Sequence, residues 1–180
     1  MSRKLLILIH MYMAAFLAPA LILVAVSGGL YLLGNGGDMA KTRVDLPANT
    51  TLDFSAADLD AELRTLLAKL DPDYSFEYIK NRGTKIQTRP TSRAYYEFAI
   101  KDGNLSAAHV KPNFQGVMIE LHKGHGPKLF KLYQKFLALG LLLIVLSGLW
   151  VGLASAVHRK KTLLTTIAGV LLFIVLGFVV

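Results

Sequence analysis

The stretch LLILIHMYMAAFLAPALILVAVSGGLYLL, residues 5–33, contains no Asp, Glu, Lys or Arg. Two further uncharged apolar stretches follow at residues 137–156 and 163–180. A helix needs about 20 apolar residues to cross roughly 30 Å of hydrocarbon, so each stretch is about long enough to span a bilayer. All twelve acidic residues lie between the first two stretches. The sequence therefore predicts a membrane protein with three transmembrane α-helices and one polar insert.

Composition and charge narrow the classes of function. The chain has 180 residues, of which 53% are hydrophobic, and it contains no cysteine. Thiol catalysis, disulfides and Cys-ligated zinc or iron–sulfur centres are therefore excluded. Much of the net charge of +8 lies beside the apolar stretches, where no acid offsets Arg3, Lys4, Arg159, Lys160 and Lys161. Such residues report on topology and lipid headgroups, so we predict a lipid bilayer as a partner and no nucleic acid.

The same charges predict an orientation. Short cytoplasmic loops carry an excess of Lys and Arg, which places the N-terminus and residues 158–161 in the cytoplasm. The insert and the C-terminus are then extracytoplasmic. Four lysines just before the second stretch lie on the outer side, but long translocated segments are largely exempt from this rule. We interpret the first stretch as an uncleaved span rather than a cleaved signal peptide, whose apolar core has only roughly 7–15 residues.

The insert has the pattern of a small α+β module. Leucines at helical spacing predict a helix from Ser55 to about Leu70. Four strand candidates follow at residues 74–80, 84–89, 94–100 and 105–110, and glycine-containing turns separate the first two and the last two of them. A helix on one face of an antiparallel meander can bury a modest core. We expect four residues in that core: Leu63, Leu66, Tyr96 and Phe98.

These patterns give the expected domain boundaries. Residues 1–34 form the first transmembrane helix, and residues 35–126 form the extracytoplasmic module with its linkers. Residues 127–157 form the second transmembrane helix, which starts near Pro127. Residues 158–180 form a short cytoplasmic loop and the third transmembrane helix. Within the module, residues 38–49 are predicted as a linker, and residues 117–121 fit either a strand or a helix.

Two histidines lie near the predicted cytoplasmic side of the spans. His10 stands near the start of the first span, where an ionisable residue is a functional candidate. Imidazole is also a common axial ligand of haem iron. His158 directly follows the second span and could face His10 across antiparallel helices. The alternatives are an interfacial histidine bonded to a carbonyl for His10, and a solvated basic loop for His158.

His122 and His125 precede the second span on the other side. Their spacing would place both on one face of a helix, where they could share a metal ion or a haem edge. The alternative is an ordinary turn, which the neighbouring glycines and proline favour. A membrane thickness separates His10 from His122 in this arrangement, so the two cannot bind the same iron within one chain.

Small residues interrupt two of the spans. Ser27-Gly28-Gly29 and Ser147-Gly148 let helices or a flat cofactor approach closely, and tight helix packing is the more common use. The insert has no nucleophilic serine motif, no phosphate loop and no His-Glu-x-x-His sequence. We therefore predict no catalytic residues.

These features, taken in order, resemble the PepSY-associated transmembrane family. The residues that carry the resemblance are His10, Ser27-Gly28, Leu121-His122-Lys123-Gly124 and Ser147-Gly148, within residues 5–157. The resemblance implies a PepSY-like helix-and-meander module and a bacterial inner-membrane location. Larger members include iron-regulated proteins and haem-bearing reductases of ferric siderophores. They have four or more spans, whereas this chain corresponds to one repeat unit with an added third span.

Two hypotheses of function follow. In the first, the chain is a subunit associated with redox, iron or haem metabolism, and any enzymatic role is that of an oxidoreductase. It would bind b-type haem through His10, His122, His125 or His158, with further ligands from a second copy or another membrane subunit. In the second, the chain is a non-catalytic anchored module that recognises a partner or assists assembly through its extracytoplasmic domain. The sequence leaves this choice open and names no metal, electron donor or partner.

Overall fold

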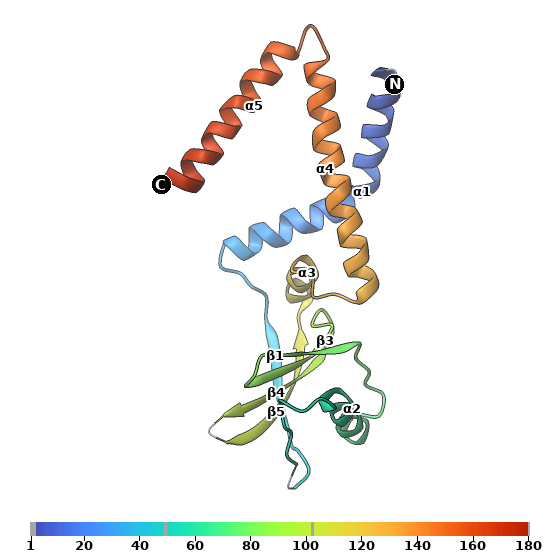
Figure 1. Cartoon of the computed structure of the whole chain (residues 1–180), viewed down its shortest axis with the longest axis vertical. Coiled ribbons are helices and arrows are strands. Elements are labelled where there is room, and N and C mark those ends of the chain that lie inside the picture. Colours follow the sequence, from blue (N-terminus) through green and yellow to red (C-terminus); the bar gives the residue numbers. More distant parts are fainter. Residues whose placement is uncertain (1–2, 49, 102, 180) are drawn as a thin grey trace. The chain divides into compact units, whose positions relative to one another are not determined.

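The computed structural model describes residues 3–48, 50–101 and 103–179 (Figure 1). Within this part, three helices are long and apolar enough to cross a membrane: Lys4–Leu32, Lys128–Leu153 and Arg159–Val179. They coincide with the three predicted spans, so a multi-pass membrane protein with a polar insert is confirmed. The chain divides into two compact units, one that runs to Leu21 and resumes at Lys135, and another from Ile22 to Gln134.

The first unit consists of helices and the turn at residues 154–158 that joins two of them. It contains α1 (Arg3–Leu32) as far as Leu21, α4 (Lys128–Leu153) from Lys135 onward, and α5 (Arg159–Ile174), which continues as the π-helical segment η1 (Val175–Val179). No described residue of α5 is buried. A helix that is apolar all round and unburied suits contact with lipid. The close packing of α1 on α4 depends on Gly140, because a Cβ there would collide with the side chain of Leu17.

The second unit contains a five-stranded antiparallel sheet. Its strands are β1 (Met39–Val44), β2 (Tyr78–Asn81), β3 (Lys85–Arg89), β4 (Tyr95–Lys101) and β5 (Asn104–Pro112), in the spatial order β1-β5-β4-β3-β2. The β2–β5 meander follows the predicted strands, although β2 is shorter than expected. Neighbouring pairs such as Ile86 with Phe98 set the register, and these side chains share one face of the sheet.

The hydrophobic core lies between that face and α2 (Leu59–Leu70). Leu63 and Phe98 are fully buried, Tyr96 is buried, and Leu66 is half-buried at the margin of the same cluster. The predicted core is therefore confirmed, with Leu66 at its edge. The helix covers the sheet because its leucines recur at helical spacing along a single face.

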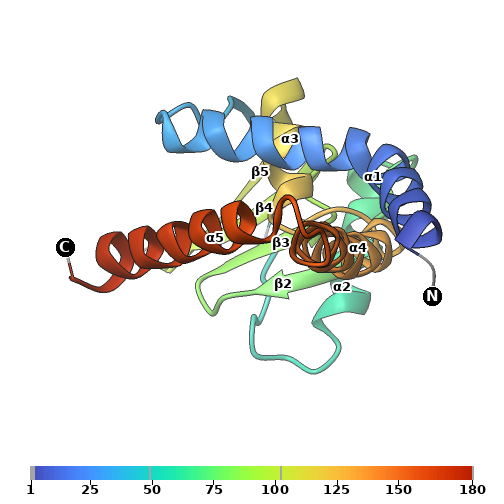
Figure 2. The same cartoon turned by 90° about the horizontal axis from the view of Figure 1, so that it is seen from above.

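The opposite face of the sheet is covered in part by α3 (Phe114–His122). Asn113 caps this helix, since its side-chain oxygen accepts a hydrogen bond from the backbone N–H of Gly116 at 2.8 Å. Ile119 of α3 is buried, as are Tyr95 and Val110 on this side of the sheet. Both views show α3 beside the C-terminal part of α1, within the same unit (Figure 2).

These helices and strands test three local predictions made from the sequence. Residues 38–49 are not simply a linker, because Met39–Val44 pairs with β5 as an edge strand; its exposed lysine and arginine are typical of sheet edges. Ser55 is not the helix cap, because its N–H is bonded to Asp53 in a preceding turn and α2 begins at Leu59. The ambiguous stretch at residues 117–121 is helical.

Candidate ligand site at the membrane histidines

His10 is held by a Ser-Gly pair on another helix. Its Nδ1 lies 2.8 Å from the hydroxyl oxygen of Ser147 in α4. The next residue, Gly148, has no side chain, and a Cβ there would lie 3.3 Å from Cε1 of the His10 ring. The glycine therefore makes a shallow seat for the imidazole, and the serine fixes the ring at one nitrogen.

The hydroxyl of Ser147 has two neighbours, Nδ1 of His10 and the carbonyl of Ile144, one turn back in α4, at 3.1 Å. A hydroxyl that donates its single hydrogen to this carbonyl accepts from the imidazole, which pairs with the tautomer that carries its proton on Nδ1 and a lone pair on Nε2. The contact is equally compatible with the other tautomer, in which the hydroxyl donates to Nδ1. In the described part of the chain, Nε2 has no hydrogen-bond partner of its own.

His122 repeats this arrangement in the second unit. Its Nδ1 lies 2.9 Å from the hydroxyl oxygen of Ser27 in α1, and Ser27 donates to the carbonyl of Val24 at 3.2 Å. Gly28 follows the serine, and a Cβ there would lie 3.1 Å from Cε1 of the ring. The contact is compatible with the same tautomer, in which Nδ1 of His122 carries the N–H and Nε2 a lone pair, and also with the reverse one.

Four glycines in the spans face a side chain of another helix, and they do so in two different ways. Gly140 and Gly152 accept aliphatic or threonine side chains, from Leu17 and Thr162, as expected of helix packing. Gly28 and Gly148 accept only histidine rings within 4 Å of the hypothetical Cβ. The two Ser-Gly pairs are therefore ring seats, and the histidine of each seat comes from a different helix.

A small pocket adjoins the His122 ring. Its volume is about 170 Å³, and its lining comprises Ser27, Gly28, Tyr31, Ile119, His122 and Lys123. The ammonium of Lys123 lies 5.0 Å from the centre of the Tyr31 ring and 3.6 Å from Oε1 of Glu120. The pocket therefore has an imidazole on its wall and a cation beside it.

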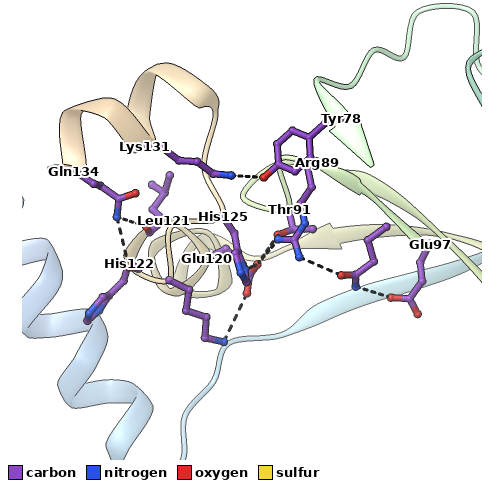
Figure 3. Close-up of polar contacts among 12 residues, drawn as sticks. Tyr78, Arg89, Thr91, Glu97, Glu120, Leu121, His122, His125, Lys131 and Gln134 are labelled. Carbon is purple, nitrogen blue, oxygen red and sulfur yellow. Dashed lines mark hydrogen bonds and ion pairs between the residues drawn. The ribbon is translucent and has the colours of Figure 1, made fainter. Parts of the chain in front are cut away.

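His125 has a separate set of partners (Figure 3). Its Nδ1 is 2.7 Å from Oε2 of Glu120, and the same oxygen accepts a hydrogen bond of 2.5 Å from Thr91. Thr91 in turn accepts from the guanidinium of Arg89 at 2.7 Å. Arg89 is only 2% exposed, and its Nε has no partner among the described residues. This polar row ties the C-terminal half of α3 to the sheet.

The electrostatics of this row favour a carboxylate beside a neutral imidazole. Burial alone would raise the pKa of Glu120, but hydrogen bonds from Thr91 and His125 hold that pKa below its usual range. Burial lowers the pKa of His125, although the bond to Glu120 acts in the opposite direction. The lowered pKa of His125 favours its neutral form, and its contact with Glu120 links the segment after α3 to this row.

The row continues across the sheet to a second carboxylate. Gln87 accepts from Arg89 at 3.4 Å and donates to Glu97 at 3.1 Å. Lys41 and Lys85 contact the same carboxylate at 3.0 and 2.8 Å. Burial alone would raise the pKa of Glu97, yet bonds from the lysines and Gln87 keep it lowered. The charges on this face are thus mutually compensated, which is typical of a structural network.

The predicted histidines are therefore engaged separately. His122 and His125 contact different partners, Ser27 and Glu120, rather than a common one. His158 bonds to Ser155 at 2.9 Å in the turn before α5, while His10 bonds to Ser147. No group of three His, Cys, Asp or Glu side chains able to hold a metal ion occurs within the described ranges.

Some residues of the site carried no signal in the sequence. His10 and Ser147 are 137 residues apart in the sequence, and His122 and Ser27 are 95 residues apart, so no local pattern indicates that they pair. Glu120 is a single acid inside the apolar run Val117–Leu121, and nothing local marks it as a partner of Arg89 or Thr91. The repeated Ser-Gly pairs were the one available hint, because each lies inside a span.

Comparison with known proteins gives one match. Residues 75–180, more than half of the chain, match the model of the PepSY_TM-like family. No curated protein and no solved structure gives a significant match. The matched residues run from the start of the β2–β5 meander through α5 and include both His122 and the Ser147-Gly148 seat.

Proposed function

The chain belongs to the PepSY_TM-like family, and from this premise we propose that it is a membrane subunit which holds b-type haem through Nε2 of His10 and Nε2 of His122. The single observation that carries the proposal is the repeated seat. In each, a serine hydroxyl lies within hydrogen-bond distance of Nδ1 and a glycine makes room for the ring. A ligating histidine is usually oriented through its other ring nitrogen in this way.

The residues present fit such a group. Imidazole is the commonest axial donor to haem iron, and an unprotonated nitrogen is required for ligation. In the tautomer with its proton on Nδ1, each histidine presents such a nitrogen at Nε2. When bound, the haem would supply one-electron transfer. The residues of the chain position the imidazoles and keep the Nδ1 protons engaged with the serines.

Each seat offers one histidine, so a haem held there would need a further ligand from elsewhere. We propose that this ligand comes from a second copy of the chain, from another membrane subunit, or, for the His10 site, from His158. The charge bias of the ends supports an N-terminus in the cytoplasm, an extracytoplasmic module and a bacterial inner membrane as the location. These assignments belong to the same proposal.

An absorption spectrum tests the proposal. The full chain, purified from its native membrane with its partners, should show a Soret band and reduced-minus-oxidised bands of b-type haem. His10→Ala should remove one of two haem signals and leave the other, and His122→Ala should do the reverse. His109→Ala is the matched control, since His109 lies in β5 and its ring contacts the Tyr96 ring at a tilted angle, away from both seats. Wild-type protein with no Soret band would overturn the proposal.

One observation favours the alternative, an anchored binding module. A pocket of about 570 Å³ lies between residues 43–52 and the β4–β5 hairpin. Its volume is within the range of roughly 300–1,000 Å³ typical of ligand sites. Should the native protein lack haem, recognition of a small ligand or partner segment by this module becomes the better function.

A further inference from the structure

The helical unit, which runs to Leu21 and resumes at Lys135, carries a charge that its own residues do not balance. It contains no Asp or Glu, because all twelve acids of the chain lie between residues 38 and 120. Its Lys and Arg residues are Arg3, Lys4, Lys135, Arg159, Lys160 and Lys161. All of them except Lys135 lie at the start of α1 or the start of α5.

Contacts between α1 and α4 place these two basic segments at the same end of the unit (Figure 1). Leu17 of α1 faces Gly140 of α4. His10 lies seven residues earlier in α1 and contacts Ser147, seven residues later in α4, so the helices are antiparallel. A further seven residues, about 10 Å along each helix, lead to the start of α1 and to the turn after α4. The cations of α1 are therefore level with those of α5.

Arg159 is anchored through one edge of its guanidinium. Its Nε donates to the backbone carbonyl of Leu153, the last residue of α4, at 2.9 Å. Its two Nη groups make no hydrogen bond or ion pair among the described residues. A planar guanidinium matches the oxygens of a phosphate with two parallel N–H donors. The bond to α4 therefore holds a fork for an anion in place.

The start of α5 adds positive potential that no protein anion offsets. Its N-cap residue, His158, makes no side-chain cap bond, and the first turn contains no acid. Lys160 and Lys161 are exposed, and neither forms an ion pair in the part of the chain that the structure describes. The N–H groups at a helix N-terminus carry a partial positive charge, so neighbouring cations are unfavourable unless an anion binds there.

From these contacts we infer that this end of the helical unit binds the phosphate of an anionic phospholipid. The inference goes beyond the proposed function and does not depend on haem. The apolar part of α5 begins at Leu163, two residues after Lys161, and no described residue of α5 is buried. An anion held by the cations therefore lies beside a surface that suits acyl chains. An amphiphile satisfies both features, whereas a free phosphate would leave the apolar surface uncovered.

Trp150 allows lipid at this end to be observed directly. It is the only tryptophan of the chain, it lies one turn before the end of α4, and its side chain is exposed. Bromine atoms on acyl chains quench tryptophan fluorescence on contact. The full chain is reconstituted in mixtures of phosphatidylglycerol and phosphatidylcholine in which one lipid or the other is brominated. We expect the anionic lipid to be preferred about 3- to 10-fold beside Trp150.

Arg159→Gln and Lys135→Gln form a matched pair, because each removes one positive charge from the same unit. Arg159→Gln should lower the preference at least about twofold, and Arg159→Lys, which keeps the charge without the fork, should give an intermediate value. Lys135→Gln should leave the preference unchanged, since Lys135 lies 15 residues before Trp150. The double change Lys160→Gln and Lys161→Gln preserves the bond between Arg159 and Leu153 and should also lower the preference.

Three outcomes would overturn the inference. The first is a wild-type protein that shows no preference for the anionic lipid. The second is an equal loss in Lys135→Gln and in the Arg159 and Lys160/Lys161 variants, which would indicate diffuse surface charge. The third is competition by inorganic phosphate at constant ionic strength, which would show that the cations take a free anion. Emission in unbrominated phosphatidylcholine that matches wild type verifies the insertion of each variant.

Discussion

The seats of His10 and His122 use the same parts in two separate units. In each, a serine hydroxyl contacts Nδ1 of the histidine and also bonds to the backbone carbonyl one turn earlier in its own helix. The glycine that follows the serine faces Cε1 of the imidazole ring. They differ in their surroundings: His122 comes from α3, which hydrogen bonds tie to the sheet, whereas the seat of His10 joins two apolar helices, α1 and α4. This repetition is the observation on which the proposed function rests.

Among changes that keep both histidines, removal of the serine hydroxyl should have the largest effect on haem binding. Ser27→Ala and Ser147→Ala each remove the acceptor that orients Nδ1–H. Loss of such an orienting partner typically weakens metal affinity by about 10–100-fold, and we expect this loss at the matching site only. Haem titration of each variant in a background lacking the other histidine measures it. Equal weakening at both sites by either variant would show that the seats do not act independently.

Replacement of the glycine in each Ser-Gly pair by alanine should weaken haem binding less than loss of the serine hydroxyl does. Gly28→Ala places a methyl 3.1 Å from the ring and Gly148→Ala places one 3.3 Å away, so each ring must shift by a few tenths of an ångström. We expect haem to bind several-fold more weakly, with the larger loss at Gly28, since ligand geometry must be held within about 0.5 Å.

Gly29→Ala is the matched control for this change. A Cβ at Gly29 would meet nothing within 4 Å, so only the helix propensity changes, by roughly 1 kcal/mol in favour of alanine. Titration should therefore give an unchanged haem affinity for Gly29→Ala. A loss as large as that of Gly28→Ala would place the effect in the helix rather than in the seat.

Much of the fold follows from the sequence because its signals are local. The three spans follow from length and hydropathy, and the meander follows from alternation and turns, as in Tyr95–Lys101. The edge strand Met39–Val44 was missed because its sequence, MAKTRV, has little alternation and its pairing with β5 spans a long separation. An edge strand needs only one partner, so its own pattern is weakly constrained.

The candidate site was only partly predictable, for a different reason. His10, His122 and both Ser-Gly pairs can each be noticed in the sequence, but their pairing is a long-range property of packed helices. The expected association of His122 with His125 rested on helical spacing, yet α3 ends at His122 and His125 turns back toward Glu120. Spacing decides which residues share a helix face only while the helix continues.

The most direct test of the central claim is the protonation of the two rings without haem. Nitrogen NMR of histidine-labelled full-length protein in nanodiscs reports each ring nitrogen, and His10→Ala and His122→Ala assign the signals. The account predicts a pyrrole-type, protonated Nδ1 and a pyridine-type, unprotonated Nε2 for both His10 and His122 at neutral pH. A proton on Nε2 of either ring, or rapid averaging between the two tautomers, would contradict it.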